Sequence, residues 1–272
     1  MCMAFRSAAL LLALAIGSAC ADSRRVIRVC ADPNNLPFSN NRLDGFENRI
    51  AALVGEELGA RIEYVWWAQR RGFIRNTLRQ GLCEVVMGVP AGLEMTRTTA
   101  PYYRSSYVFV TRLGSHAPTT FDDPYLIGAT IGVHLIGDDF ANSPPAHALS
   151  ARGLIHNVRG YSVFGDYRQP NPPAALIAAV AEGGVDVAVA WGPLAGYFAK
   201  SSPVPLQLTR VRPDEEPPFP FVFEMSMGVA RSSEHLRSEL DRVITARGDD
   251  ITRILRDYGV PLVMDSALVA SQ

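Results

Sequence analysis

Polar and aromatic side chains that could bind a ligand follow three consecutive strand-like segments of the sequence. Asp32, Asn34, Asn35 and Phe38 follow the first, Trp67, Gln69, Arg70 and Arg71 follow the second, and Val89 and Pro90 close the third. Asparagine amides donate and accept hydrogen bonds, prolines stiffen a loop, and aromatic rings supply apolar walls. An ordinary turn that stops a strand would explain one such cluster. Three clusters together favour a binding site.

The segments that carry these residues alternate between strands and helices. Strand-like runs at residues 26–31, 61–67 and 83–89 enclose helical patterns at residues 45–60 and 73–81. Units of this kind form parallel sheets through right-handed crossovers, and ligands bind beyond the carboxyl ends of the strands. We therefore expect the three clusters to meet at one rim of a sheet.

The second half of the chain repeats the pattern, which predicts an α/β fold of two lobes. Strands are expected at residues 129–135 and 185–191, with proline-started helices at 144–153 and 172–184. Each lobe should hold a mostly parallel sheet flanked by helices. The predicted boundaries place residues 22–111 and 225–272 in lobe 1 and residues 112–224 in lobe 2, with a double crossover between them.

The first 21 residues have the features of a secretory signal peptide. Arg6 precedes an apolar run too short to span a bilayer, and Ala19-Cys20-Ala21 forms a cleavage site before Asp22. Lipoprotein processing at Cys20 is the alternative. We expect a mature chain that is exported to the periplasm and is not inserted in the membrane. Its formal net charge of −1, with acidic and basic residues intermixed, also argues against nucleic acid as a partner.

Export changes the role expected of the cysteines. Cys2 and Cys20 leave with the signal segment, and Cys30 and Cys83 remain as a pair in an oxidising compartment. A disulfide is one interpretation and two buried, reduced cysteines are the other. Parallel neighbouring strands in simple register would hold these two residues too far apart for a bridge.

Six long motifs, in order along the chain, resemble the MxaJ/XoxJ-type proteins. They are "RVCADPNNLPFSN", "GFENRIA", "WWAQRRGFIRNTL", "CEVVMGVPAG", "TAPYYRSSYVFV" and "VDVAVAWGPLAGYFA". The resemblance implies a type 2 periplasmic solute-binding fold. It also implies a role beside a pyrroloquinoline-quinone (PQQ) dependent methanol dehydrogenase, in its assembly or activation, with no transported solute assigned and a small ligand in the cleft left open.

Amino-acid receptors of this fold bind the ligand with two charged residues, and this chain has neither of them in its usual form. Their arginine binds the ligand carboxylate as a bidentate partner, but here Pro90 and Ala91 replace the neighbouring hydroxyl residues and Arg97 lies only loosely near the arginine position. Trp191 stands where their ammonium-binding aspartate would be. Its indole can stack on a ligand ring or cation, or pack between the lobes.

Motifs for catalysis, cofactor binding and metal binding are absent from the sequence. It has no nucleophile elbow, zinc-protease, dinucleotide-binding or EF-hand motif, so we expect no enzyme activity and no cofactor. Glu47 is interpreted as a helix first-turn charge rather than a catalytic acid. The acidic pairs Asp122-Asp123 and Asp138-Asp139 are expected to face solvent rather than bind metal. Arg70 and Arg71 have two interpretations, as contacts for an anionic ligand or acidic partner, or as solvated side chains.

Three functions are therefore compared. The first is an accessory protein of a PQQ-dependent methanol dehydrogenase, acting through or near the interlobe cleft. The second is the substrate-binding receptor of an ABC transporter for a small solute that is not an amino acid. The third, an exported enzyme, would need a reactive group of residues that the sequence does not contain.

Overall fold

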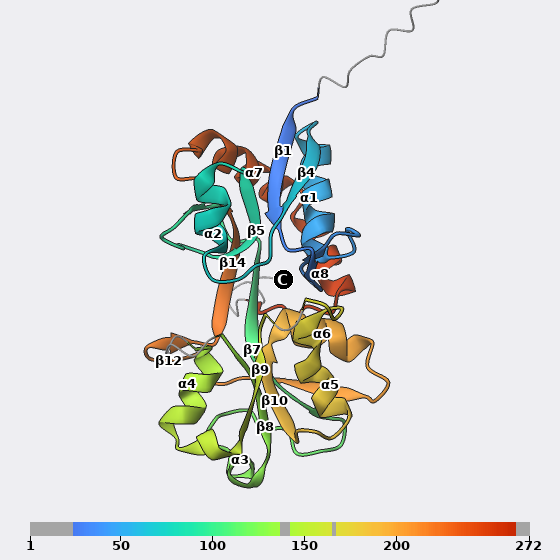
Figure 1. Ribbon diagram of the computed structural model, residues 1–272, viewed down its shortest axis with the longest axis vertical. Helices are drawn as coiled ribbons and strands as arrows, with labels where there is room; N and C mark the ends of the chain where they lie inside the picture. The colour runs from blue at the N-terminus through green and yellow to red at the C-terminus, as the bar shows by residue number, and fades with distance from the viewer. Residues whose placement is uncertain (1–23, 137–141, 165–166, 265–272) are drawn as a thin grey trace, which may run out of the picture.

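Two long strands, β7 (Tyr103–Arg112) and β14 (Val222–Val229), connect two α/β lobes in this computed structural model (Figure 1). The structure describes residues 24–136, 142–164 and 167–264. The expected signal segment and Asp138-Asp139 lie outside these residues. In the described part of the chain, no helix is both long enough and apolar enough to cross a membrane.

The sheet of lobe 1 has the strand order β4-β1-β5-β14. Strand β1 (Val26–Ala31) runs parallel to both β4 (Arg61–Trp66) and β5 (Val85–Pro90), whereas β14 is antiparallel to β5. The three parallel strands end at one edge, as the sequence predicts. The loops that carry the candidate residues therefore lie together.

The sheet of lobe 2 continues from β7 in the order β7-β10-β8-β9. Strands β8 (Ile131–Leu135), β9 (Val158–Ser162) and β10 (Val187–Trp191) are parallel, and β11 (Leu206–Arg210) pairs with β7 from the other side. The start of β7 pairs with β14 and its later part pairs with β10 and β11. The two lobes, their mostly parallel sheets and the double crossover confirm the predicted fold class.

Helices and short strands complete both lobes. The helices are α1 (Phe46–Glu57), α2 (Phe73–Asn76), η1 (Leu78–Gln80), α3 (Tyr125–Gly128), α4 (Pro144–Ala151), η2 (Leu154–Asn157), η3 (Pro172–Ala174), α5 (Ala175–Ala181), α6 (Gly192–Lys200), α7 (Glu234–Ala246) and α8 (Gly248–Asp257). The short strands are β2 (Asn34–Asn35), β3 (Ser39–Asn40), β6 (Arg97–Thr98), β12 (Glu215–Glu216) and β13 (Phe219–Pro220).

Apolar residues at helical spacing on α1 form the centre of the lobe 1 core. Phe46 and Ile50 are fully buried, and they pack in one cluster with the inner faces of β1 and β5 and with Leu240 of α7 and Leu255 of α8. Burying one such side chain contributes about 1.5–3 kcal/mol. The C-terminal helices therefore belong to lobe 1 by packing, although they follow lobe 2 in the sequence.

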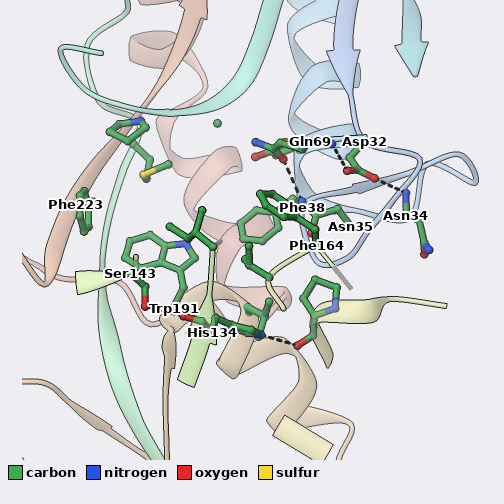
Figure 2. Close-up of a pocket in the computed structure, with 18 of the residues that line it drawn as sticks. Asp32, Asn34, Asn35, Phe38, Gln69, His134, Ser143, Phe164, Trp191 and Phe223 are labelled. Atoms are coloured by element: carbon green, nitrogen blue, oxygen red, sulfur yellow. Dashed lines mark hydrogen bonds between the residues drawn. The ribbon is translucent and has the colours of Figure 1, made fainter. Parts of the chain in front are cut away.

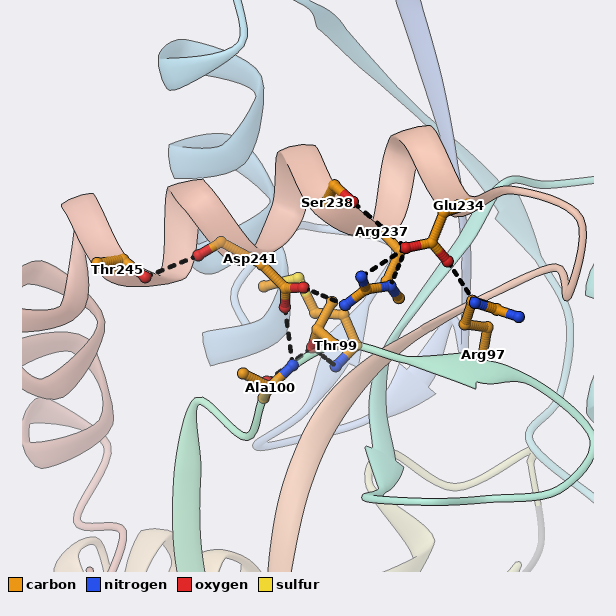
Figure 3. A network of polar contacts seen from close by, with 9 residues as sticks. Arg97, Thr99, Ala100, Glu234, Arg237, Ser238, Asp241 and Thr245 are labelled. Atoms are coloured by element: carbon orange, nitrogen blue, oxygen red, sulfur yellow. Dashed lines mark hydrogen bonds and ion pairs between the residues drawn. The ribbon is translucent and has the colours of Figure 1, made fainter.

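A polar network also attaches α7 to the connection between β5 and β7 (Figure 3). Glu234 forms ion pairs with Arg97 of β6 and with Arg237 one turn along its own helix. Asp241 accepts a hydrogen bond from the backbone amide of Ala100 at 2.8 Å and pairs with Arg237. Contacts of this kind position the exposed side of the helix while the apolar side supplies most of the stabilisation.

The segment after α8 returns to the junction between the lobes. Tyr258 stacks on Tyr197 of α6 with ring centroids 5.7 Å apart, and the hydroxyl of Ser105 donates to the carbonyl of Pro261 at 2.7 Å. Gly196 and Gly259 pack backbone to backbone, because a Cβ on Gly196 would lie 1.9 Å from the Gly259 carbonyl oxygen. This close contact joins α6 of lobe 2 to the end of the lobe 1 helices.

Cys30 and Cys83 form a disulfide. Their Cα atoms are 5.5 Å apart, within the range that a disulfide requires. Strand register does place Val86 rather than Cys83 beside Cys30, as expected. Cys83 nevertheless reaches Cys30, because it lies in the turn segment before β5 and not in the extended strand. The bridge lies in an apolar cluster with Phe73, Leu78 and Val89, between the sheet and α2.

We expect the double variant Cys30→Ala/Cys83→Ala to lower the free energy of unfolding by about 2–4 kcal/mol, because it releases the unfolded chain from a closed loop. Urea unfolding with and without reductant measures this. Reductant should destabilise the native chain and leave the double variant unchanged. Equal unfolding curves for the reduced and oxidised native chain would contradict the prediction.

We also expect Gly196→Ala to lower the free energy of unfolding by more than about 2 kcal/mol, because the new methyl group overlaps the Gly259 carbonyl. Gly128→Ala is the matched control, since a Cβ there meets no atom within 4 Å. Thermal and urea unfolding of the two variants should differ clearly. Equal stability of both variants would show that the α6 contact is not a constraint.

Candidate functional site

A cavity of about 370 Å³ lies between the two lobes, at the carboxyl ends of the lobe 1 strands (Figure 2). Its volume falls in the range of small-molecule sites. Lobe 1 and the crossover strands contribute Asp32, Asn34, Asn35, Phe38, Glu47, Gln69, Gly88, Pro90, Tyr107, Phe223 and Met225, and lobe 2 contributes His134, Ile136, Ser143, Val163, Phe164, Tyr167, Pro173, Trp191 and Leu194.

Asp32 connects three segments at the edge of this cavity. Asp32 is 1% exposed, and one of its carboxylate oxygens accepts a hydrogen bond from the backbone amide of Asn34 at 2.8 Å. The other oxygen accepts hydrogen bonds from the backbone amide of Gln69 at 2.6 Å and from the hydroxyl of Tyr167. Buried charges persist only when they are hydrogen-bonded in this way. One carboxylate thus joins the loops after β1 and β4 to lobe 2.

Asn34 makes a second contact across the cleft. The side-chain amide nitrogen of Asn34 donates to the backbone carbonyl of Gln169 at 2.8 Å. The side-chain amide oxygen accepts from the backbone amide of Asn171 at 2.9 Å. The guanidinium of Arg70 lies 4.8 Å from the ring centre of Tyr167, a cation–π distance. The loop after β1 therefore holds the lobe 2 segment that leads to η3.

Glu47 is the second residue of α1 and faces the cavity. Its carboxylate lies directly against Gly88 of β5, where a Cβ would be 2.2 Å from Glu47 Oε1. Burial, with a smaller contribution from the charge of Asp32, raises the pKa of the Glu47 carboxyl to about 8. At pH 7 the Glu47 carboxyl is therefore protonated in most molecules.

Aromatic side chains from both lobes form one wall. Trp191, at the end of β10, packs edge to face with Tyr107 of β7 and Phe223 of β14, with centroid distances of 5.4 and 5.7 Å. Phe38 approaches from lobe 1 (Figure 2) and packs on Phe46 of α1 at 5.4 Å. Trp191 therefore both packs at the lobe junction and faces the cavity, which combines the two interpretations made from the sequence.

His134 is a neutral member of the lining. Its Nε2 donates to the carbonyl of Pro173 at 3.1 Å, and burial lowers its pKa to about 4. The hydroxyl of Ser143 donates to the backbone carbonyl of His134 at 2.7 Å. Burial therefore keeps the imidazole uncharged at neutral pH, so it adds no positive charge to the cavity.

Most residues expected at the site line the cavity, and four do not. Asp32, Asn34, Asn35, Phe38, Glu47, Gln69, Pro90 and Trp191 are all part of the lining. Val89 is instead buried in the cluster around the disulfide, because it points to the opposite face of β5. Trp67 is 43% exposed on the outer surface. Arg70 contacts Tyr167 outside the lining, and Arg71 is exposed on the surface.

Apart from Trp191, the residues on the lobe 2 side of the cavity were not predicted from the sequence. Phe164 and Tyr167 follow β9, a strand with mostly exposed residues and a glycine, so its sequence carries no clear strand pattern. Tyr107 and Phe223 lie on the crossover strands, and their role depends on how the lobes meet. Proline-rich turns on both sides of these segments were the one local indication.

Among the described lining residues there is no arginine and no lysine. Arg97, the loose match to the carboxylate anchor of amino-acid receptors, pairs with Glu234 on α7 instead. No group of three or more His, Cys, Asp or Glu in the described chain is arranged to hold a metal ion. The acids predicted to face solvent at positions 122 and 123 form pairs with Arg152 and His116.

The raised pKa of Glu47 predicts a loss of stability as pH rises. The folded chain keeps a proton that the unfolded chain releases above about pH 4.5, so stability should fall between pH 5 and 8 by on the order of 2–4 kcal/mol and then level off. Urea unfolding at pH 5, 6.5 and 8 measures this. Glu47→Gln should remove that part of the pH dependence, whereas Glu94→Gln, at an exposed loop position, should retain it. Identical slopes for native and Glu47→Gln chains would contradict the assignment.

Comparisons with known proteins identify relatives over nearly the whole chain. The chain is 30% identical to Protein MoxJ of Paracoccus denitrificans over 268 residues, which is 93% of this chain and 95% of the relative. Periplasmic binding protein XoxJ from Methylobacterium extorquens AM1 shares 37% identity and a TM-score of 0.73, covering 88% of this chain and all of that one.

MxaJ from Methlophaga aminisulfidivorans MPT superposes with a TM-score of 0.76 at 25% identity, covering 87% of this chain and all of that one. No protein-family model matches the sequence. The near-complete coverage agrees with the six motifs and with the two-lobed fold. The chain belongs to the MoxJ family of periplasmic binding proteins, the group that includes MxaJ and XoxJ.

Proposed function

We propose that this chain is an exported accessory protein of a PQQ-dependent methanol dehydrogenase and that it assists assembly or activation of that enzyme by protein binding. Family membership supports the link to methanol oxidation, and the signal-like residues 1–21 support export to the periplasm with a mature chain that begins at Asp22. The protein acts by binding and catalyses no reaction of its own in this proposal.

The observation that carries this proposal is the absence of arginine and lysine from the described lining of the cavity. A nutrient receptor for amino acids must neutralise a carboxylate, and a bidentate arginine is the usual partner. Here Trp191 stands at the place of the aspartate anchor, and Arg97, loosely near the arginine anchor, pairs with Glu234. The fold of a receptor is thus retained without its recognition groups. Binding of a partner protein does not require those groups.

A transport receptor for a small uncharged or cationic solute is the second candidate. The cavity is well formed and contacts from both lobes enclose it, which favours a ligand of limited size. Such a receptor would bind its solute tightly and would gain a large thermal shift. It would not depend on a dehydrogenase.

Deletion of the gene in its own host tests the accessory role. We expect PQQ-dependent methanol dehydrogenase activity in the periplasm to fall at least about tenfold, because in this proposal the enzyme is not assembled or activated without the chain. A tenfold change corresponds to about 1.4 kcal/mol of coupling between the proteins. Activity is measured in periplasmic extracts with the dehydrogenase quantified separately. A plasmid copy of the full chain should restore it.

A copy that lacks residues 1–21 is the matched control, because it encodes the same mature chain without the export segment. This copy should fail to restore activity. Unchanged dehydrogenase activity in the deletion strain, together with loss of uptake of one solute, would overturn the accessory role in favour of the transport receptor.

A further inference from the structure

The cavity has a charge pattern that the accessory role does not explain. Among the described lining residues, Asp32 and Glu47 are the acids, no arginine or lysine opposes them, and His134 is uncharged at neutral pH. Asp32 is satisfied by three hydrogen bonds from its own surroundings. Within the described residues, the Glu47 carboxyl makes no hydrogen bond or ion pair; it lies against Gly88 and faces the open volume. A positively charged group placed there could pair with the Glu47 carboxyl without displacing another partner of that carboxyl.

The opposite wall suits the same kind of group. Trp191, Tyr107 and Phe223 form an edge-to-face cluster from β10, β7 and β14, and Trp191 and Phe223 appear beside the open volume in Figure 2. Such rings offer a large apolar surface to the carbon body of a small organic cation, and their faces also attract its positive charge through their quadrupoles. Apolar residues such as Val163, Leu194 and Met225 fill most of the remaining surface.

We propose that the interlobe cavity binds a small organic cation, an ammonium or methylated ammonium group on a short apolar body, with the head group at Glu47 and the body against Trp191, Tyr107 and Phe223. This binding activity goes beyond the accessory role and does not depend on association with a dehydrogenase. The two proposals can therefore fail separately.

The same geometry disfavours other ligands. A ligand with carboxylates would bring negative charge beside the Asp32 carboxylate, with no arginine or lysine in the described lining to offset it. A zwitterionic amino acid would leave its carboxylate unpaired in a mostly apolar site. A volume of about 370 Å³ also limits the occupant to a small molecule or a single side chain.

Binding of a cation should release a proton from Glu47. Burial keeps this carboxyl protonated at pH 7, and a cation beside it favours the ionised form. The titratable groups near Glu47 are Asp32 after β1, Tyr64 of β4 and Tyr102 and Tyr103 of β7. The pKa values of the three tyrosines are raised, so they stay neutral here. Affinity should therefore increase as pH rises from 6 to 8.

Isothermal titration calorimetry of the mature chain with n-butylammonium and tetramethylammonium tests the proposal, with 1-butanol and butyrate as neutral and anionic controls. We expect binding of the two cations alone, about tenfold tighter at pH 8 than at pH 6. Titrations in two buffers of different ionisation enthalpy should show proton release. Weak or absent binding of both cations, or equal binding of butyrate or butanol, would overturn the proposal.

Variants assign the effect to the cavity. Glu47→Gln should weaken cation binding at pH 8 at least about tenfold and abolish proton release, and Trp191→Leu should weaken binding without changing proton release. Glu94→Gln, whose carboxylate is exposed outside the cavity, should bind as the native chain does. Circular dichroism confirms folding of each variant. Native-like binding by Glu47→Gln would contradict the assigned head-group position.

The cation can come from a free amine or from a lysine side chain of another protein. N-acetyl-lysine amide presents the second source in the same calorimetric titration. Tighter binding of this probe than of n-butylammonium would assign the site to a protein ammonium group, and the reverse order would assign it to a small amine. Both orders support a cation site, whereas absent binding of both n-butylammonium and tetramethylammonium removes it.

Discussion

A buried carboxylate, Asp32, is the constraint on which the interlobe site depends. It ends the first strand, and its two oxygens accept hydrogen bonds from the loop after β1, the loop after β4 and Tyr167 of lobe 2. A charge with 1% exposure is tolerated only while these donors remain, so the same contacts that stabilise Asp32 also hold the lobes together. Asn34 extends this contact to Gln169 and Asn171. The cavity is therefore enclosed by the groups that position its own lining.

The lobe junction is supported from a second side by elements remote from the cavity. Strand β7 pairs with β14 in the lobe 1 sheet and with β10 in the lobe 2 sheet, and the segment after α8 contacts α6 through the close approach of Gly196 and Gly259. The disulfide and the α7 network stiffen lobe 1 alone. Rigid lobes with contacts concentrated at their junction are typical of folds that open and close around a ligand. Retention of this architecture without charged anchors for an amino acid explains how a receptor fold can serve another kind of partner.

Much of the fold and half of the site could be predicted from the sequence, for physical reasons. The spacing of Phe46 and Ile50 and the apolar run of β5 report burial directly, and parallel strands bring their carboxyl ends to one edge. The contribution of lobe 2 could not be predicted in this way. Tyr167 reaches Asp32 across 135 residues of sequence, and Tyr107 and Phe223 face the cavity only because two strands cross between lobes. Val89 was misplaced because the face of a strand depends on register, which a continuous apolar run does not reveal.

Recovery of partners from periplasmic extract of methanol-grown cells, with native mass spectrometry of the recovered mature chain, tests the central claim most directly. The account predicts that a PQQ-dependent methanol dehydrogenase is recovered with the chain, in a complex whose mass equals the sum of the two proteins with or without a small cation. A tightly held solute and no dehydrogenase, in extract where the dehydrogenase is abundant, would contradict the accessory role.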